Sequence, residues 1–421
     1  MIKKTFQTIG IRLIGTAATF ALSVFVARGL GPDGAGYFFY GLAVMVGAAT
    51  LGRLGLTEVA VRFVSANTGP DNAAGAYAVT ALAIVAILSI AVALFVWILG
   101  PVVMTYFNPN GAAFGLAIAQ LAYAIPAVAM TVVLCGVLQG YRRPVTASFL
   151  ETGFVPLLVL LGAITLKTDN LSSFIGLYVG ASMLGLICAT VLAMRQAGPG
   201  AMLSANKARE LVHAGHPLLS VNMMGYIIRF APLLCLGIFA TPSDTGVYAI
   251  VIRLGLIFGI ILQSLNNVLR PAFAVAHQTG ALVDLQRQIQ SGGLFLLAIG
   301  LPLIAGTMFF RQPILLLFGP EFVGGGLALV ILLLGQTVNL ITASSGAILA
   351  MTGNERTLRT YTFITALLCI LLSVALIPPF GLIGAASATA LTIALQGLLA
   401  AGGVYRKVGV WPFVSFQSIQ H

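Results

Sequence analysis

Charged side chains are scarce in this 421-residue chain, and their scarcity excludes most classes of soluble protein. Only 7% of the residues are Asp, Glu, Lys or Arg, whereas 59% are hydrophobic, and the mean hydropathy is +1.05. Apolar cores stop growing at about 250–300 residues, and a soluble surface of this size still needs charge. Long, uninterrupted apolar runs also exclude a β-barrel, whose strands alternate in polarity. The composition therefore predicts an all-α polytopic membrane protein.

Catalytic and metal-binding motifs are absent as well. The sequence contains no P-loop, no His-Glu-x-x-His motif and no paired-aspartate metal motif. Its four cysteines lie within apolar runs without metal-ligand spacing, and a zinc site at His213 and His216 would lack further ligands. We therefore expect no enzyme activity, no cofactor and no metal. Without a nucleotide site, the protein cannot hydrolyse ATP itself.

Twelve apolar segments are long enough to be transmembrane helices, which need about 20 residues each. Ile9–Arg28 is too long for the apolar region of a signal peptide, so we expect it to remain as the first span. The twelve segments are Ile9–Arg28, Tyr37–Val61, Ala76–Ile98, Ala113–Leu138, Thr146–Leu166, Ser173–Met194, Pro217–Ala240, Gly246–Leu269, Gly292–Phe310, Gly325–Met351, Thr360–Ile377 and Leu382–Val404.

The distribution of Lys and Arg predicts the orientation in the membrane. One set of span ends carries fourteen of these cations, and the opposite set carries only Arg28, Lys167 and Arg311. Cytoplasmic loops are enriched in Lys and Arg, so both termini are expected in the cytoplasm. The same rule explains the formal net charge of +11 without a nucleic-acid partner.

The two halves of the sequence resemble each other. Gly31–Ala35 precedes span two, and Thr241–Thr245 precedes span eight at an offset of 210 residues, which also carries Phe63 onto Phe273. Gln139–Arg142 after span four matches Thr352–Glu355 after span ten at an offset of 213. The segment GLYVGAS from Gly176 resembles GLIGAAS from Gly381.

Each half thus has six spans in the same order, which predicts a parallel pseudo-repeat. Two such bundles around a central cavity would allow alternating access, so a transporter is favoured over a membrane-embedded enzyme. The predicted domains are an N-terminal lobe at 1–194, a cytoplasmic linker at 195–216, a C-terminal lobe at 217–405 and a cytoplasmic tail at 406–421.

Arginines within the spans are the candidate functional residues, because intramembrane charge is costly and usually faces a cavity or a partner. The guanidinium group binds phosphate through two parallel hydrogen bonds, so these arginines predict an anionic ligand. Arg53 and Arg253 are the leading pair. Each arginine is alternatively explained by snorkelling or by pairing with a carboxylate. The six candidates, all in or at the ends of the first two spans of a half, are Arg53, Arg253, Arg229, Arg28, Arg12 and Arg270.

The order of several short motifs resembles the Wzx-type O-antigen and exopolysaccharide flippases of the multidrug/oligosaccharidyl-lipid/polysaccharide exporter superfamily. The motifs are Ala27–Pro32 followed by Gly36-Tyr37, Leu54–Leu56 in span two, Leu138–Gly140, and GLIGAAS at the start of span twelve. The resemblance covers essentially the whole chain.

The resemblance implies a V-shaped fold of two six-helix lobes in the bacterial inner membrane. It implies transport of an undecaprenyl-diphosphate-linked oligosaccharide to the periplasmic leaflet, with the diphosphate held by the arginines. The expected partners are that polyprenyl-diphosphate-linked glycan, membrane lipids, and the polysaccharide polymerase and chain-length machinery.

Three other functions remain open. A cation-coupled multidrug exporter of the same superfamily usually needs a buried carboxylate, and no Asp lies deep in any span. A peptidoglycan lipid-precursor flippase would resemble relatives that have two additional helices. A glycan polymerase or ligase would need a large outer loop, which the sequence lacks. Glu58 is a candidate for ion coupling through Arg53 or Arg62, although a structural ion pair near the interface is the favoured explanation, because such pairs are common at span ends.

Overall fold

A computed structural model describes residues 2–68, 73–197, 202–255, 259, 282–342 and 345–411. Within these ranges the regular structure is helical and contains no strand. The chain divides into two compact units. The N-terminal unit comprises Met1–Tyr226 and Thr241–Gly246, and the C-terminal unit comprises Ile227–Ala240 and Val247–His421. The lobe, linker and tail boundaries that the sequence predicts, at 194, 216 and 405, remain predictions.

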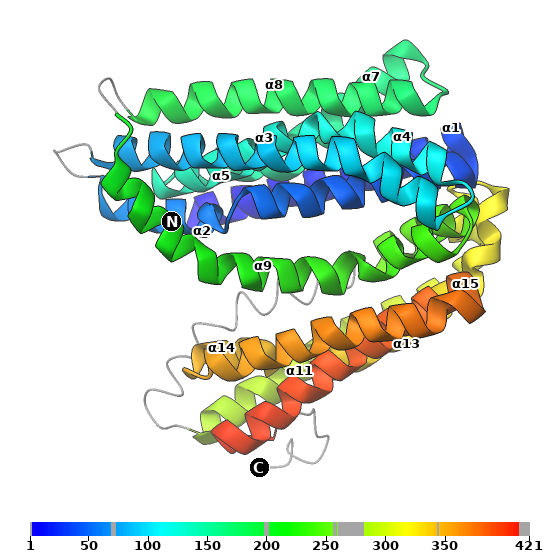
Figure 1. The fold of residues 1–421 in the computed structure, drawn as a ribbon. Helices are drawn as coiled ribbons and strands as arrows, with labels where there is room; N and C mark the ends of the chain where they lie inside the picture. The colour runs from blue at the N-terminus through cyan, green and yellow to red at the C-terminus, as the bar shows by residue number, and fades with distance from the viewer. Residues whose placement is uncertain are drawn as a thin grey trace. The chain divides into compact units, whose positions relative to one another are not determined.

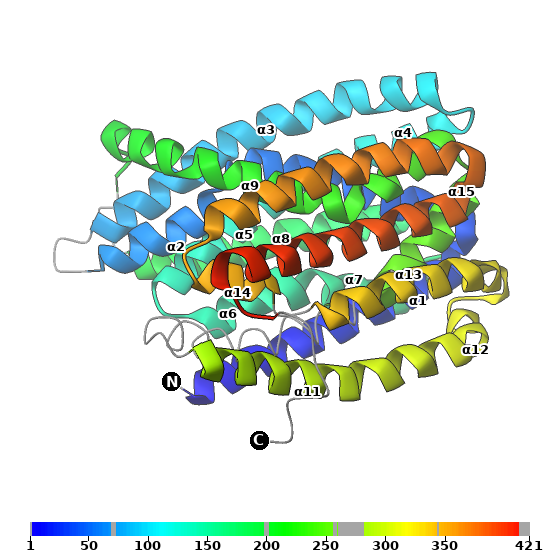
Figure 2. The same ribbon diagram turned by 90° about the horizontal axis from the view of Figure 1, so that it is seen from below.

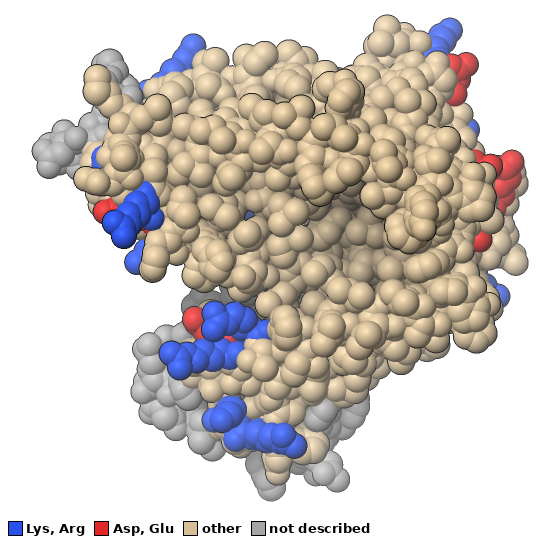
Figure 3. All heavy atoms as spheres, in the orientation of Figure 1, with Lys and Arg blue, Asp and Glu red and all other residues tan. Residues whose placement is uncertain are grey.

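The N-terminal unit is a helical bundle with α5 at its centre. α5 contacts α2, α3 and α8, and most of its residues are buried (Figure 1). On the face drawn in Figure 3, charged side chains of this unit lie at the helix ends, and the surface between them is uncharged. Its helices are α1 (Ile2–Gly52), α2 (Leu56–Ala66), α3 (Ala73–Phe107), α4 (Gly111–Ala122), α5 (Ala124–Gly140), α6 (Pro144–Ser148), the π-helix η1 (Phe149–Phe154), α7 (Val155–Leu166), α8 (Leu171–Ala197) and the first part of α9 (Ala205–Phe239).

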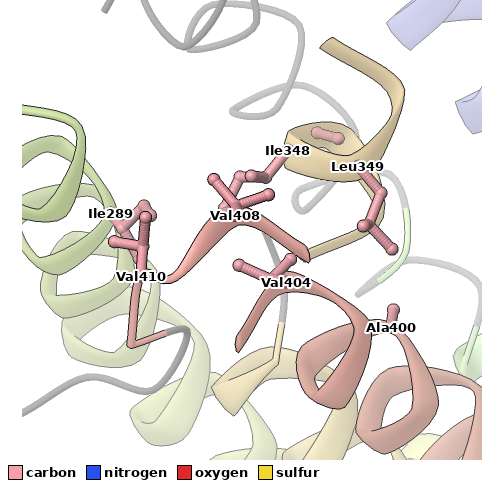
Figure 4. Packing of buried hydrophobic residues seen from close by; sticks show 8 residues of the cluster. Ile289, Ile348, Leu349, Ala400, Val404, Val408 and Val410 are labelled. Atoms are coloured by element: carbon pink, nitrogen blue, oxygen red, sulfur yellow. The ribbon is translucent and has the colours of Figure 1, made fainter. Parts of the chain in front are cut away.

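The C-terminal unit is built around α15. α13 and α14 both pack along this helix, and α11 packs against α13 (Figures 1 and 2). Near the C-terminal end of α15, Val404 and Val408 pack with Ile348 and Ile289 in a buried apolar cluster (Figure 4). Besides the part of α9 that begins at Ile227 and the helical residues 247–255, the helices are α11 (Leu282–Phe309), α12 (Arg311–Leu316), the 3₁₀-helix η2 (Pro320–Gly325), α13 (Gly326–Ile341), α14 (Ser345–Met351) and α15 (Glu355–Val408).

The helices confirm the predicted all-α membrane fold. Eight described helices are long and apolar enough to cross a membrane, or nine if the bent pair of α4 and α5 is one span. α1 and α15 each contain a glycine with non-helical angles, Gly31 (φ 65°) and Gly381 (φ 52°). α15 therefore holds two of the predicted spans, and α1 holds the first span and most of the second. Within the described ranges, the predicted spans coincide largely with helical residues, and most of Gly246–Leu269 lies outside those ranges.

Two predicted spans are interrupted. In the fourth span, α4 and α5 meet at Tyr123 with a 46° bend, since Pro126 cannot donate a hydrogen bond to the carbonyl of Ala122. The second span breaks between α1 and α2, where Leu54 (φ 49°) and Gly55 (φ 69°) are left-handed. The sequence-based prediction of one continuous helix over Tyr37–Val61 was therefore wrong.

The turns after α5 and α14 show the internal repeat directly. In the first turn, the amide of Arg143 donates to the carbonyl of Leu138, and in the second, the amide of Asn354 donates to Leu349. A left-handed residue precedes each donor, Arg142 (φ 58°) in one case and glycine 353 (φ 75°) in the other. Equivalent positions are thus 211 residues apart. The predicted offset of 213 was wrong here. The two turns are aligned by their left-handed residues, which lie 211 residues apart, and not by the similarity of their sequences.

A reciprocal contact joins the equivalent turns of the two repeats, and all of its residues belong to the N-terminal unit. A Cβ atom on Gly36 would overlap the carbonyl oxygen of Pro242, and a Cβ atom on Gly246 would overlap the carbonyl oxygen of Pro32. Both pairs are related by the same offset of 210 residues. The absence of a side chain at both glycines therefore allows the two backbones to touch.

Candidate substrate-binding site

Arg53 lies in the break between α1 and α2. It follows the last residue of α1, Gly52, and its side chain is half-buried. Its Nε donates to the carbonyl of Ala49 at 3.3 Å, and its Nη2 donates to Oγ1 of Thr50 at 2.7 Å. The guanidinium group is therefore held at the C-terminal end of a helix, where carbonyl groups favour a cation.

Four charged side chains interact electrostatically around this break, and we call them the mixed-charge cluster. Arg53 interacts with Glu58 on α2 and with Glu151 on η1, and Glu151 also interacts with Arg12 on α1. Arg12, Glu58 and Glu151 are exposed at the surface of the N-terminal unit. The cluster contains two guanidinium groups and two carboxylates, so its formal charges balance.

Glycines bring the helices of the mixed-charge cluster together. An added Cβ on Gly15, one turn after Arg12, would lie 2.9 Å from the backbone of Thr152, next to Glu151. An added Cβ on Gly136 would lie 2.5 Å from the carbonyl oxygen of Thr57. α1 and η1 therefore meet at Gly15, and α5 meets α2 at Gly136, because small residues permit close helix packing.

Glu151 lies on a π-helix, which is the rarest helical form and often occurs at functional positions. Pro156 follows five residues later and has no backbone N–H to donate to the carbonyl of Thr152. Thr152 in turn donates its hydroxyl to the carbonyl of Ser148 at 2.8 Å. The wider turn of η1 therefore has a local cause in the sequence.

The first part of α9 covers the same region of the N-terminal unit. Nδ2 of Asn222 donates to Oε2 of Glu58 at 3.5 Å. Four residues later, the hydroxyl of Tyr226 donates to the carbonyl of Ala43 at 2.8 Å, and its ring fills the space beside Gly47. Glu58 thus has an amide donor as well as a neighbouring guanidinium group.

The other candidate arginines lie outside the mixed-charge cluster. Arg28 is exposed and lies sixteen residues after Arg12 on α1, which corresponds to about 24 Å along a helix. Arg229 is exposed on the part of α9 that belongs to the C-terminal unit. Arg253 is half-buried in that unit, and its Nη1 donates to the carbonyl of Ala249 at 2.8 Å. Arg270 lies outside the described residues.

Arg53 and Arg253 do not occupy equivalent positions in the repeat. Arg253 lies seven residues after Gly246, whereas Arg53 lies seventeen residues after the equivalent Gly36. At 1.5 Å per helical residue, these separations are about 10 Å and about 25 Å. The two arginines, predicted as the leading pair, therefore lie at different levels of their own repeats.

Glu151 was not among the predicted site residues, although it interacts electrostatically with three of them, Arg12, Arg53 and Glu58. Its signal in the sequence is a carboxylate within an apolar segment, followed by proline five positions later. Within the described ranges, no group of three or more His, Cys, Asp or Glu side chains is arranged to hold a metal ion. The mixed-charge cluster is therefore a site in which two guanidinium groups and two carboxylates balance in formal charge.

The amino-acid sequence is similar to those of known proteins. Residues 1–277 match the family described as polysaccharide biosynthesis protein. The chain is also 30% identical over 185 residues to the probable flippase AglR of Haloferax volcanii, an alignment that covers 43% of this chain and 38% of that protein. The chain therefore spans less than half the length of this curated relative.

Two solved structures share the fold. The lipid II flippase MurJ in an inward closed conformation has a TM-score of 0.77 at 13% identity, covering 96% of this chain and 87% of that chain. An inward-facing multidrug resistance MATE family transporter of the MOP superfamily has a TM-score of 0.71 at 16% identity, covering 96% and 98%. At these identities the similarity concerns the fold alone.

Proposed function

Because the chain belongs to the polysaccharide biosynthesis protein family, we propose that it is a flippase for a lipid-linked glycan. Its substrate is a polyprenyl-diphosphate-linked oligosaccharide, which it moves across the cytoplasmic membrane by alternating access for surface polysaccharide synthesis. The relative in Haloferax volcanii, described as a probable flippase, supports transport as the activity. We place the protein in a bacterial cytoplasmic membrane with both termini in the cytoplasm.

The observation that carries this proposal is the half-buried guanidinium group of Arg53 at a break in a transmembrane helix. Broken helices in transporters offer unpaired backbone groups and side chains to a substrate within the membrane. A diphosphate needs cationic donors there, because it must leave water to change sides. In this proposal Arg53 and Arg253 bind the diphosphate, and Arg229, Arg28, Arg12 and Arg270 support them.

A cation-coupled multidrug exporter is the second candidate function. It is favoured by one observation, the exposed carboxylate of Glu151 within the predicted fifth span. A cationic drug or a coupling ion would be attracted to such a group. Against this function, Arg12 and Arg53 already balance Glu58 and Glu151, so the cluster offers no excess of negative charge. In the flippase proposal, Glu58 is the candidate for coupling transport to an ion gradient.

The proposal is tested by reconstituting the purified protein in vesicles with a fluorescent polyprenyl-diphosphate oligosaccharide. A membrane-impermeant quencher reports the rate at which the lipid reaches the outer leaflet. We expect Arg53→Gln and Arg253→Gln each to lower this rate by about 10- to 100-fold. A hydrogen bond to a charged group is worth about 1.5–3 kcal/mol, and each 1.4 kcal/mol is a factor of ten.

Arg311→Gln is the matched control, because Arg311 is exposed at the start of α12 and donates to the carbonyl of Met308. This variant is expected to transport at the wild-type rate. Full transport by both Arg53→Gln and Arg253→Gln would remove these residues from the site. Transport of a cationic dye but not of the glycan lipid would replace the flippase with the exporter.

A further inference from the structure

Glu151 lacks a role in the function proposed above. A carboxylate within a membrane span is costly, so it usually pairs with a cation or serves the transported ligand. The residue is exposed on the surface of the N-terminal unit, and the backbone next to it packs tightly against Gly15. The helix is thus firmly held at this point, while the carboxylate itself remains accessible.

The hydrogen bonds of Arg53 show how the cations near Glu151 are held. Arg53 directs its Nε and Nη2 to Ala49 and Thr50 of its own helix, not to a carboxylate. Its position is therefore set by α1, and Glu151 acts on it through charge. Glu58 differs from Glu151, because it accepts a hydrogen bond from Asn222 of α9.

We propose that Glu151 is the exchangeable counter-charge of Arg53 and Arg12, balancing these cations while the site is empty and competing with an anionic ligand for them. This inference rests on the proposed function, since the ligand is the diphosphate of the carrier lipid. Two carboxylates balance the two guanidinium groups before binding. When the diphosphate binds, its negative charge replaces that of the Glu151 carboxylate as the counter-charge of the two arginines.

The competition gives Glu151 a definite effect on transport. A site with two uncompensated arginines would bind a diphosphate tightly and release it slowly. A nearby carboxylate weakens the bound state, so the ligand can leave on the other side of the membrane. Glu151 is therefore a positioning residue. Its negative charge lowers the affinity for the diphosphate by acting on Arg53 and Arg12.

The test measures binding of glycan-free polyprenyl diphosphate to the purified full-length protein in detergent, together with the flipping rate in vesicles. Glu151→Gln removes one negative charge at nearly constant volume. We expect about tenfold tighter binding, since the loss of a neighbouring negative charge acts strongly at the effective dielectric constant of a protein. The flipping rate is expected to fall several-fold as release slows. Glu321→Gln is the matched control, because it makes the same change in net charge at the exposed start of η2.

Two further variants separate this role from a structural one. Glu151→Asp keeps the charge and is expected to bind with wild-type affinity, and its melting temperature reports folding. In the double variant Arg53→Gln/Glu151→Gln, most of the gain in affinity should disappear, because the competed cation is gone. Unchanged or weaker binding by folded Glu151→Gln would overturn the inference and leave the flippase proposal intact. No binding by the wild-type protein would overturn both.

Discussion

The two halves of this protein share their backbone design but differ in the charges they hold. The spans predicted in the first half contain two carboxylates, Glu58 and Glu151, together with Arg12, Arg53 and, as the last residue of the first span, Arg28. The spans predicted in the second half contain Arg229 and Arg253 and no Asp or Glu. The duplication therefore preserved the architecture, while the intramembrane charges diverged.

The conserved part of the repeat is made of backbone contacts. The amides of Arg143 and Asn354 close equivalent turns, and Gly36 and Gly246 lie in a reciprocal contact. Such contacts depend on where the chain must turn or approach another backbone closely. Side chains that carry charge depend instead on the ligand, so they can differ between repeats with little cost to the fold. Three sets of substitutions test how far this equivalence extends.

The largest expected effect comes from Gly36→Ala and Gly246→Ala. Each adds a Cβ atom that overlaps a carbonyl oxygen of the equivalent turn, so the backbone must move. Overpacking of this kind costs about 1–3 kcal/mol. Because the contact is reciprocal, the two variants should lower the melting temperature in detergent by similar amounts, and the double variant by less than the sum.

Gly180→Ala on α8 is the matched control, since no atom lies within 4 Å of its added Cβ. It should be neutral or slightly stabilising, because Ala favours helix more than Gly does. Wild-type stability in both Gly36→Ala and Gly246→Ala would show that the two turns do not touch in the folded protein.

The second substitution exchanges side chains between equivalent core positions, Phe38 and Tyr248. Phe38 is fully buried, with the rings of Phe39, Phe174 and Tyr178 around it. Phe38→Tyr would bury a hydroxyl group among these aromatic rings. We expect a loss of about 1–3 kcal/mol in the free energy of unfolding, the usual cost of a buried polar group without a partner.

The measurement for Phe38→Tyr is thermal unfolding in detergent, with Phe309→Tyr as the comparison. Phe309 is 79% exposed at the end of α11, so its new hydroxyl group can reach water. Equal stability of Phe38→Tyr and Phe309→Tyr would mean that the buried Phe38 position accepts a hydroxyl group without cost. The Phe38 position would then resemble the equivalent position in the other half, where Tyr248 already carries a hydroxyl group.

The smallest effect is expected for Tyr248→Phe. Tyr248 is fully buried, and its hydroxyl group shares a hydrogen bond with Thr389 at 2.5 Å. Thr389 also donates to the carbonyl of Ala385 at 2.9 Å, so it keeps a partner after the substitution. The expected loss is about 1 kcal/mol, the net value of one hydrogen bond. Tyr106→Phe, at a tyrosine that is 84% exposed, should leave the unfolding temperature unchanged.

Part of the candidate site could be predicted and part could not. Arg12 and Arg53 were found because a cation in an apolar run is conspicuous at any position. Glu58 was found in the same way, because a carboxylate in an apolar run is equally conspicuous. Their association with Glu151 was not predicted, because Glu151 lies almost a hundred residues after Arg53 and joins it only through packing of α1 against η1. The break at Leu54 and Gly55 was missed too, since no proline marks it.

The sequence by itself determined that the chain is helical, where its apolar spans lie and that it contains a repeat. A membrane requires each span to satisfy its own backbone hydrogen bonds, so length and hydropathy of a local segment are sufficient to find it. Only the tertiary structure decided which charges are neighbours and where a helix opens. Those features depend on the side chains of distant helices meeting at glycines such as Gly15 and Gly136, and no local property of the sequence records that meeting.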